Sequence, residues 1–180
     1  MKKQVLFISQ TSLMLALLIV IQLMTRGMSQ FITGPLVNMV LLVTVFTVSL
    51  AGGIVVALLS PFLAFLIGIG PAFIQIVLFV SLANTIFVTV AWLLANKFID
   101  SKEIKEKIKT AIALLISAIT KTTVLWIGLV QLALPYIPGL KPQQQVVIAS
   151  SFSWPQLITA LVGGALAWIV IPIVVKATKK

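Results

Sequence analysis

Apolar residues occur along this chain in long runs, separated by short stretches that hold most of the charged residues, prolines and glycines. A helix that crosses a bilayer needs about 20 predominantly apolar residues, and shorter ones are tolerated inside a bundle. Six runs meet this criterion, so the pattern predicts one domain, residues 1–180, built as a six-transmembrane-helix bundle. The predicted helices are 5–24, 35–50, 52–67, 71–96, 108–134 and 152–175.

The first three runs are less regular than the others. The first follows Lys2 and Lys3, as the apolar part of a signal peptide would, but it extends over about 20 residues without a small-residue cleavage site. We therefore expect a retained helix. The second and third runs are short and are joined by "SLAGG", so we expect them to be tilted, partly re-entrant or offset toward one leaflet.

The composition indicates that the predicted helices lie in a membrane, and the distribution of charge indicates their orientation. Hydrophobic residues make up 61% of the chain and charged residues only 9%, which is typical of an all-α integral membrane protein. The net charge of +10 comes from basic residues that border the apolar runs, which favours membrane orientation over nucleic-acid binding. Lysines cluster at the N-terminus, after the fourth run and at the C-terminus. With six spans these clusters share one side, so the positive-inside rule predicts cytoplasmic termini.

The segments between the runs differ in character. The segment "KFIDSKEIKEKIK" alternates acids and lysines at helical spacing, which indicates either a short interfacial helix or a solvated connector. The segments "TRGMSQFITGP" and "LPYIPGLKPQQQVVIASSFSWP" contain prolines and glycines, so we expect non-helical turns that form a lid over an outward-facing cavity. No internal repeat is evident, which argues against an inverted-repeat secondary transporter.

Several kinds of chemistry are excluded by the residues that are missing. The chain has no cysteine and no histidine, and its only acids are Asp100, Glu103 and Glu106, all in one connecting segment. Thiolate metal sites, imidazole bases and buried carboxylate pairs therefore cannot form. No glycine-rich phosphate-binding loop is present. We expect neither an enzyme nor a metal or other cofactor, and any energy for transport must enter from elsewhere.

Lys121 lies inside the fifth run, with a long apolar stretch on each side. At 1.5 Å per residue it is about 18 Å from Lys109 and about 21 Å from Pro135, too deep to reach either membrane surface easily. A charge at this depth costs about 2.5 to 3.5 kcal/mol on insertion scales. We predict that Lys121 receives an anionic or strongly accepting group of a small substrate. The alternative is a lysine satisfied by backbone carbonyls at a helix break, or an uncharged amine.

Asn84 lies in the fourth run, about 19 Å from Lys97 and hence at a depth close to that of Lys121. Two polar groups at one depth suggest one pocket. At 100° per residue Asn84 shares a stripe with Ser81, whereas Gln75 points to the opposite side, so Asn84 is the first candidate and Gln75 the reserve. The alternative for Asn84 is a hydrogen bond between helices.

Other polar and aromatic residues are weaker candidates for substrate binding. Ser117 shares the predicted helix face of Lys121, Gln131 lies farther around it, and Trp126 either contacts the ligand or anchors the helix at the membrane interface. Further candidates near the predicted lid are Asn38, Arg26, Trp154 and Tyr136. We predict that Gly128 leaves room for a ligand.

Small residues recur in the predicted helices. Ser12 and Ala16 in "SLMLA" have a spacing that lets another helix approach closely, and from spacing alone we favour packing within the chain. We predict simple packing positions at Ala51, Gly52, Gly53, Gly163, Gly164 and Ala165.

These features together resemble the substrate-binding S components of energy-coupling factor vitamin transporters, a type of ABC importer of prokaryotic plasma membranes. The likeness covers nearly the whole chain and rests on six spans in under 200 residues, a basic N-terminus leading into "SLMLALLIVIQ", the segment "ITGPLVN", and a lysine in the fifth run. It is a likeness of layout rather than of a strict motif.

The resemblance implies a function and a set of partners. Such proteins bind a vitamin near the outer face, then dock on a transmembrane coupling (T) subunit driven by two cytoplasmic ATPases, and topple in the lipid bilayer to release the substrate. Many members carry an alanine-xxx-alanine docking motif on the first helix. The matching positions here are Ser12 and Ala16, so serine replaces the first alanine.

The substrate is chosen from the chemistry of Lys121. A buried lysine without a partner acid favours a carboxylate-bearing vitamin, and pantothenate is small and carries one carboxylate. Pyridoxine-type and hydroxymethylpyrimidine ligands are the alternatives. Other functional classes are a stand-alone ion-coupled carrier, an intramembrane enzyme using Lys121, and an assembly protein without a ligand.

Overall fold

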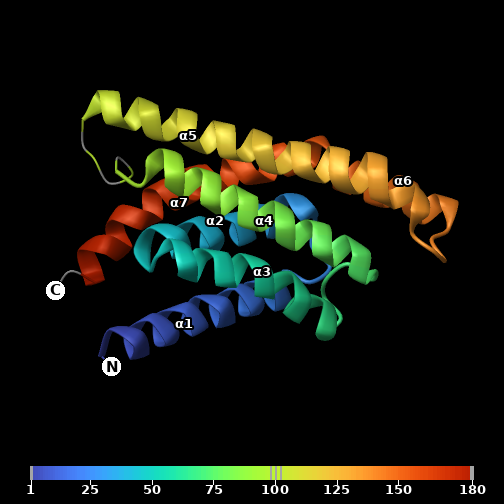
Figure 1. The fold of residues 1–180 in the computed structure, drawn as a ribbon, viewed down its shortest axis with the longest axis horizontal. Helices are drawn as coiled ribbons and strands as arrows, with labels where there is room; N and C mark the ends of the chain where they lie inside the picture. The colour runs from blue at the N-terminus through green and yellow to red at the C-terminus, as the bar shows by residue number, and fades with distance from the viewer. Residues whose placement is uncertain (1, 98, 100, 102, 179–180) are drawn as a thin grey trace.

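The computed structural model describes residues 2–97, 99, 101 and 103–178, and this part of the chain consists of helices joined by turns and connections, without a strand (Figure 1). The helices pack side by side into one elongated bundle. In chain order the elements are α1 (Lys2–Met24), α2 (Gln30–Thr47), α3 (Leu50–Leu66), α4 (Ile74–Ala95), α5 (Ile104–Thr123), the π-helix η1 (Val124–Ala133), the 3₁₀-helix η2 (Leu134–Tyr136), α6 (Pro142–Ser151) and α7 (Trp154–Thr178).

Several helices have the length and composition of membrane spans. Five helical segments of the described chain are long and apolar enough to cross a bilayer, and α3, with 17 residues, is an apolar helix of shorter length. This confirms the all-α class and the presence of helices suited to a membrane; the count of six spans stays a prediction. The two chain ends lie at the same end of the bundle, as does the α4–α5 connection, and α6 lies at the opposite end (Figure 1). We call these the termini end and the α6 end.

The predicted non-helical lid segments are partly helical, so this prediction was wrong. α2 begins at Gln30 rather than at residue 35, because Ser29 supplies an N-cap whose side chain accepts a hydrogen bond from the Phe31 amide. In the second segment α6 begins at Pro142, and the Gln144 side chain accepts from the Lys141 amide. Proline is compatible with the first turn of a helix, where its missing N–H is not needed.

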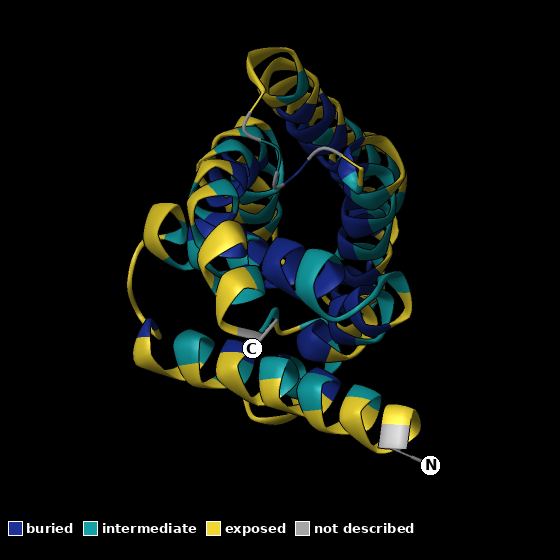
Figure 2. Ribbon diagram, turned by 90° about the vertical axis from the view of Figure 1, so that its left-hand side faces the viewer, coloured by how far each residue is buried: buried dark blue, intermediate teal, exposed yellow. Residues whose placement is uncertain are grey.

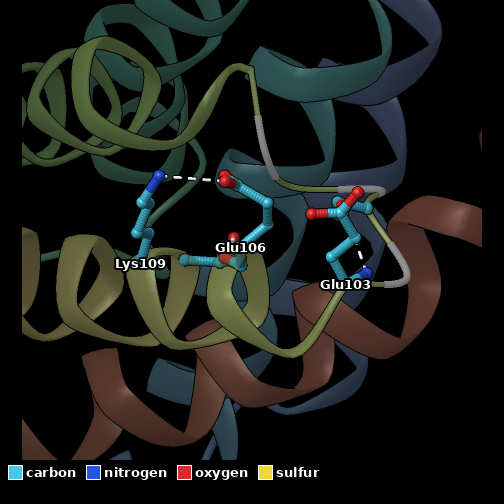
Figure 3. A network of polar contacts seen from close by, with 5 residues as sticks. Glu103, Glu106 and Lys109 are labelled. Atoms are coloured by element: carbon cyan, nitrogen blue, oxygen red, sulfur yellow. Dashed lines mark hydrogen bonds and ion pairs between the residues drawn. The ribbon is translucent and has the colours of Figure 1, made fainter.

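The second half of the charged connecting segment, from Ile104, forms the first turns of α5 rather than a separate interfacial helix. Lys109 Nζ donates to Glu106 Oε1 at 2.9 Å, and the Glu103 amide donates to Ser101 Oγ (Figure 3). Glu106 lies in the first turn, where a negative charge complements the helix dipole. Asp100 lies outside the described residues.

Beyond Thr123 the fifth span changes its helical period. η1 continues α5 without a break as ten π-helical residues, in which hydrogen bonds run from i to i+5. A residue of a π-helix therefore turns through a smaller angle than the 100° of an α-helix. Predictions of helix faces that assume an α-helix fail in this segment.

Buried residues face the interior of the bundle and exposed residues its outside, as Figure 2 shows in a view from the termini end. The closest approach is between α2 and α7. A Cβ atom on Gly163 would lie 2.5 Å from Asn38 Cβ, and one on Gly34 would lie 2.8 Å from Thr159 Cβ. A Cβ on Gly164 would meet Leu114 at an ordinary 3.7 Å. The absent side chain of Gly163 thus sets the position of Asn38.

α1 lies on one side of the bundle, with its outward face exposed (Figure 2). Ser12 and Ala16 are on this exposed face, so the prediction that they pack within the chain was wrong. The helix is apolar nearly all round, and spacing alone could not tell which side meets the bundle. Ala51 and Ala165, also predicted to pack, are exposed as well.

Candidate functional site

A cavity of about 340 Å³ opens at the α6 end and extends to the middle of the bundle. The α1–α2 and α3–α4 connections line its outer part, and residues of α1, α2, α3, α4, α5 and α7 line the rest. Its polar lining comes from widely separated parts of the sequence: Gln22, Thr25, Arg26, Gln30, Thr33, Asn38, Ser60, Asn84, Lys121 and Gln156.

Lys121 lies at the inner part of this cavity, in the last turn of α5. Its Nζ donates to Asn38 Oδ1 at 2.6 Å, and the two side chains are only 4% and 2% exposed. The ring of Phe87 adds a cation–π contact, with Nζ 5.1 Å from the ring centroid. The protein partner of Lys121 is therefore a side-chain amide oxygen, which accepts a hydrogen bond but supplies no opposite charge.

Asn84 lines the same cavity from α4, so the structure brings together the two polar residues that the sequence predicts at one depth. It is 3% exposed, and its predicted companion Ser81 is buried too. Ser81 anchors this face of the helix by donating to the Leu58 carbonyl of α3 at 3.1 Å. Asn84 Oδ1 itself has no hydrogen-bond partner among the described residues, so the structure does not show the interhelical bond that was its alternative role.

Four predicted binding residues do not line the cavity: Gln75, Ser117, Trp126 and Gln131. Ser117 is buried, but its hydroxyl donates to carbonyls of its own helix at 2.9 Å. Trp126 and Gln131 belong to η1 and are exposed. Gln75 lies in the first turn of α4, near the α6 end and away from Asn84.

Three further predictions concern aromatic residues and a glycine. Trp154 is exposed and packs at a tilt on Phe31, with ring centroids 5.9 Å apart. Tyr136 is also exposed. A Cβ on Gly128 would come within 3.2 Å of the Phe79 ring, so Gly128 makes room for a helix contact rather than for a ligand.

The sequence analysis missed the glutamines that surround the opening. Gln30 Nε2 and Gln156 Nε2 both donate to the Ser151 carbonyl, at 2.8 and 3.2 Å, and so tie α2 and α7 to the last residue of α6. Gln22, on α1, lines the cavity beside Arg26. Each lies near a helix end, where a polar side chain is common, and its position in the sequence gives no signal.

The charge around the cavity has one sign. Arg26 and Lys121 line it, and no Asp or Glu of the described chain does. Glu103 and Glu106 are at the termini end, at the start of α5. Lys121 is buried in low-dielectric surroundings, which strengthen its electrostatic interactions, whereas Arg26 is exposed. The arrangement therefore suits a small molecule with an anionic group.

The described residues contain no cluster of His, Cys, Asp or Glu that could hold a metal ion. Comparison of the chain with protein-family models, curated proteins and solved structures finds no match. The assignment of a function below rests on the residues and their geometry.

Proposed function

We propose that this protein is the substrate-binding S component of an energy-coupling factor importer, which captures a small vitamin and delivers it to an ATP-driven coupling module. The observation that carries the proposal is the cavity of about 340 Å³ with Lys121 buried at its inner part and bound to Asn38. The cavity opens at the α6 end, where the connecting segments carry few charges, as expected of an outer face.

The proposed substrate is pantothenate. A cavity of this volume is at the lower end of the range for small-molecule sites, roughly 300 to 1,000 Å³, which favours a compact ligand. Lys121 has further N–H donors besides the one given to Asn38, and Arg26 stands nearer the opening. A carboxylate beside these two groups would gain charge-assisted hydrogen bonds. Pyridoxine and hydroxymethylpyrimidine, which offer a hydroxyl or a ring nitrogen, are the alternative substrates.

The proposed partners are a transmembrane coupling subunit and two cytoplasmic ATPases. The exposed face of α1 supports this part of the proposal, because Ser12 and Ala16 leave a shallow stretch on a helix face that no other part of the described chain covers. Small residues let two helices approach closely inside a bilayer, where packing rather than hydrophobicity drives association. The coupling subunit would dock here.

A stand-alone ion-coupled carrier is the competing class, and it lacks a specific supporting observation. Such carriers use acidic groups within the membrane to bind protons or sodium. Among the described residues the acids are Glu103 and Glu106, both at the start of α5. No acidic side chain lies farther inside a described span.

The first experiment is calorimetric binding to the purified protein in detergent. We expect pantothenate to bind and pantothenol, in which a hydroxyl replaces the carboxylate, to bind at least about a hundredfold more weakly, because the contacts to a charged group are lost. Equal affinity for both would contradict the role of an anion. No heat from pantothenate but heat from pyridoxine would change the substrate and leave the importer proposal in place.

A second experiment separates the transport classes. In proteoliposomes we expect uptake only when the coupling and ATPase subunits and ATP are present. Uptake by this chain alone under a proton or sodium gradient would overturn the proposal in favour of the carrier.

A further inference from the structure

Two side-chain amides in the cavity carry a buried carbonyl oxygen without a hydrogen-bond partner in the described part of the protein. They are Gln22 Oε1 on α1 and Asn84 Oδ1 on α4. Three other amides line the cavity and have partners: the Asn38 oxygen accepts from Lys121, and Gln30 and Gln156 donate to the Ser151 carbonyl. A buried polar atom without a partner costs free energy, and folded proteins contain only a few.

The position of these two atoms is informative because they share one cavity. Only two other described side chains have a buried polar atom in this state, Thr11 and Glu106, and neither lines the cavity. Gln22 and Asn84 come from helices far apart in the sequence, and Asn84 is 97% buried, since 3% of it is exposed. Two amide oxygens of one cavity lining thus lack a protein partner, which a ligand in that cavity would supply.

The chemistry of an amide defines the matching ligand group. A side-chain amide presents an acceptor and two donors side by side, so it pairs best with a group that both donates and accepts, such as a hydroxyl or another amide. Lys121 and Arg26 only donate and pair with a carboxylate. The lining thus offers cationic donors suited to an anion and amides suited to hydroxyl or amide groups.

We propose that Gln22 and Asn84 hydrogen-bond hydroxyl or amide groups of the substrate, and that Gln22 is a specificity-determining residue. The inference rests on the proposed function, and it narrows the substrate to a small carboxylate that also carries hydroxyl or amide groups. Sites built to pair with a substrate hydroxyl reject the analogue that lacks it, because their own polar groups are then left buried and unpaired. Simple aliphatic carboxylates are rejected for this reason.

The first test needs no ligand. Replacing an amide that is reserved for a ligand by an apolar side chain of similar size removes an unpaired polar atom, so we expect Gln22→Met and Asn84→Leu to raise the midpoint of thermal unfolding of the ligand-free protein. Gln10→Met is the matched control for Gln22→Met, since Gln10 lies on α1 but outside the cavity. We expect it to leave the midpoint unchanged. A lower midpoint in both cavity variants would show that the amides serve the fold and would overturn the inference.

The second test compares pantothenate with its dideoxy analogue, which keeps the carbon skeleton, the amide and the carboxylate but lacks both hydroxyls. We expect the wild type to prefer pantothenate by roughly a hundredfold or more. Gln22→Met and Asn84→Leu should each reduce this preference by roughly tenfold, with little change in the affinity for the analogue. Gln10→Met should keep the full preference. An equal loss of affinity for both ligands in the cavity variants would contradict the inference and leave the proposed function intact.

The two tests separate the inference from the function on which it rests. If the wild type binds neither ligand, pantothenate is excluded as the substrate. The unfolding midpoints then still decide whether Gln22 and Asn84 are held for a ligand or for the fold.

Discussion

The two halves of the fifth span differ in where the structure places the candidate residues. In the first half the candidate Lys121 lies in the cavity, and in the second half the candidates lie outside it. In α5, which has the regular α-helical period, the predicted face points inward and ends at Lys121, which binds Asn38 in the cavity. In η1, which continues the same helix with a π-helical period, the weaker candidates Trp126 and Gln131 are exposed outside the cavity, which for Trp126 fits its alternative role as an interfacial anchor. The change of period begins three residues after Lys121.

The assignment of a residue to a helix face is only as accurate as the helical period that is assumed. Each π-helical residue turns through a smaller angle than an α-helical one, so the error is small near the reference residue and accumulates along the chain. Ten residues beyond Lys121, at Gln131, the error is large enough to move a side chain from the cavity to the surface. We expect substitutions in the α-helical half to be costly and those in the π-helical half to be tolerated.

The largest effect on stability is expected where the α-helical half meets α2. Asn38→Leu removes the acceptor of Lys121 and leaves its amine buried without a protein partner, so we expect the free energy of unfolding to fall by about 3 kcal/mol. The double variant Asn38→Leu with Lys121→Met removes both polar partners and should recover most of this loss. Unfolding in mixed detergent micelles measures both. Failure of the double variant to recover stability would show that Asn38 acts through packing alone.

The next largest effect tests how α7 holds Asn38 in place. Gly163→Ala puts a Cβ atom 2.5 Å from Asn38 Cβ and 2.7 Å from the Pro35 carbonyl, so α2 and α7 must separate. We expect a loss of about 2 kcal/mol in unfolding free energy and weaker pantothenate binding. Gly164→Ala is the matched control, because its Cβ meets Leu114 at 3.7 Å, and its cost should stay within about 0.5 kcal/mol. Similar losses in the two variants would mean that the close approach at Gly163 adds nothing to the cost of a Cβ atom.

The sequence predicts well those positions where a polar residue lies inside an apolar run. Lys121 and Asn84 are polar residues inside apolar runs, and burial of such residues demands partners, which is why both were found. Gln22 carries no such contrast, because a glutamine near a helix end needs no explanation. α6 was missed for a related reason. A proline that ends one segment is equally suited to begin a helix, and only the cap at Lys141 and Gln144 shows which occurs.

The smallest effects are expected in the π-helical half. Gln131→Met and Trp126→Leu alter exposed side chains outside the cavity, so we expect each to change the affinity for pantothenate by less than about twofold and the unfolding free energy by no more than about 0.5 kcal/mol. Calorimetry and unfolding on the same preparations as the Asn38 variants give a direct comparison of the halves. A loss of binding in Gln131→Met of the size expected at Lys121 would place this side chain at the ligand.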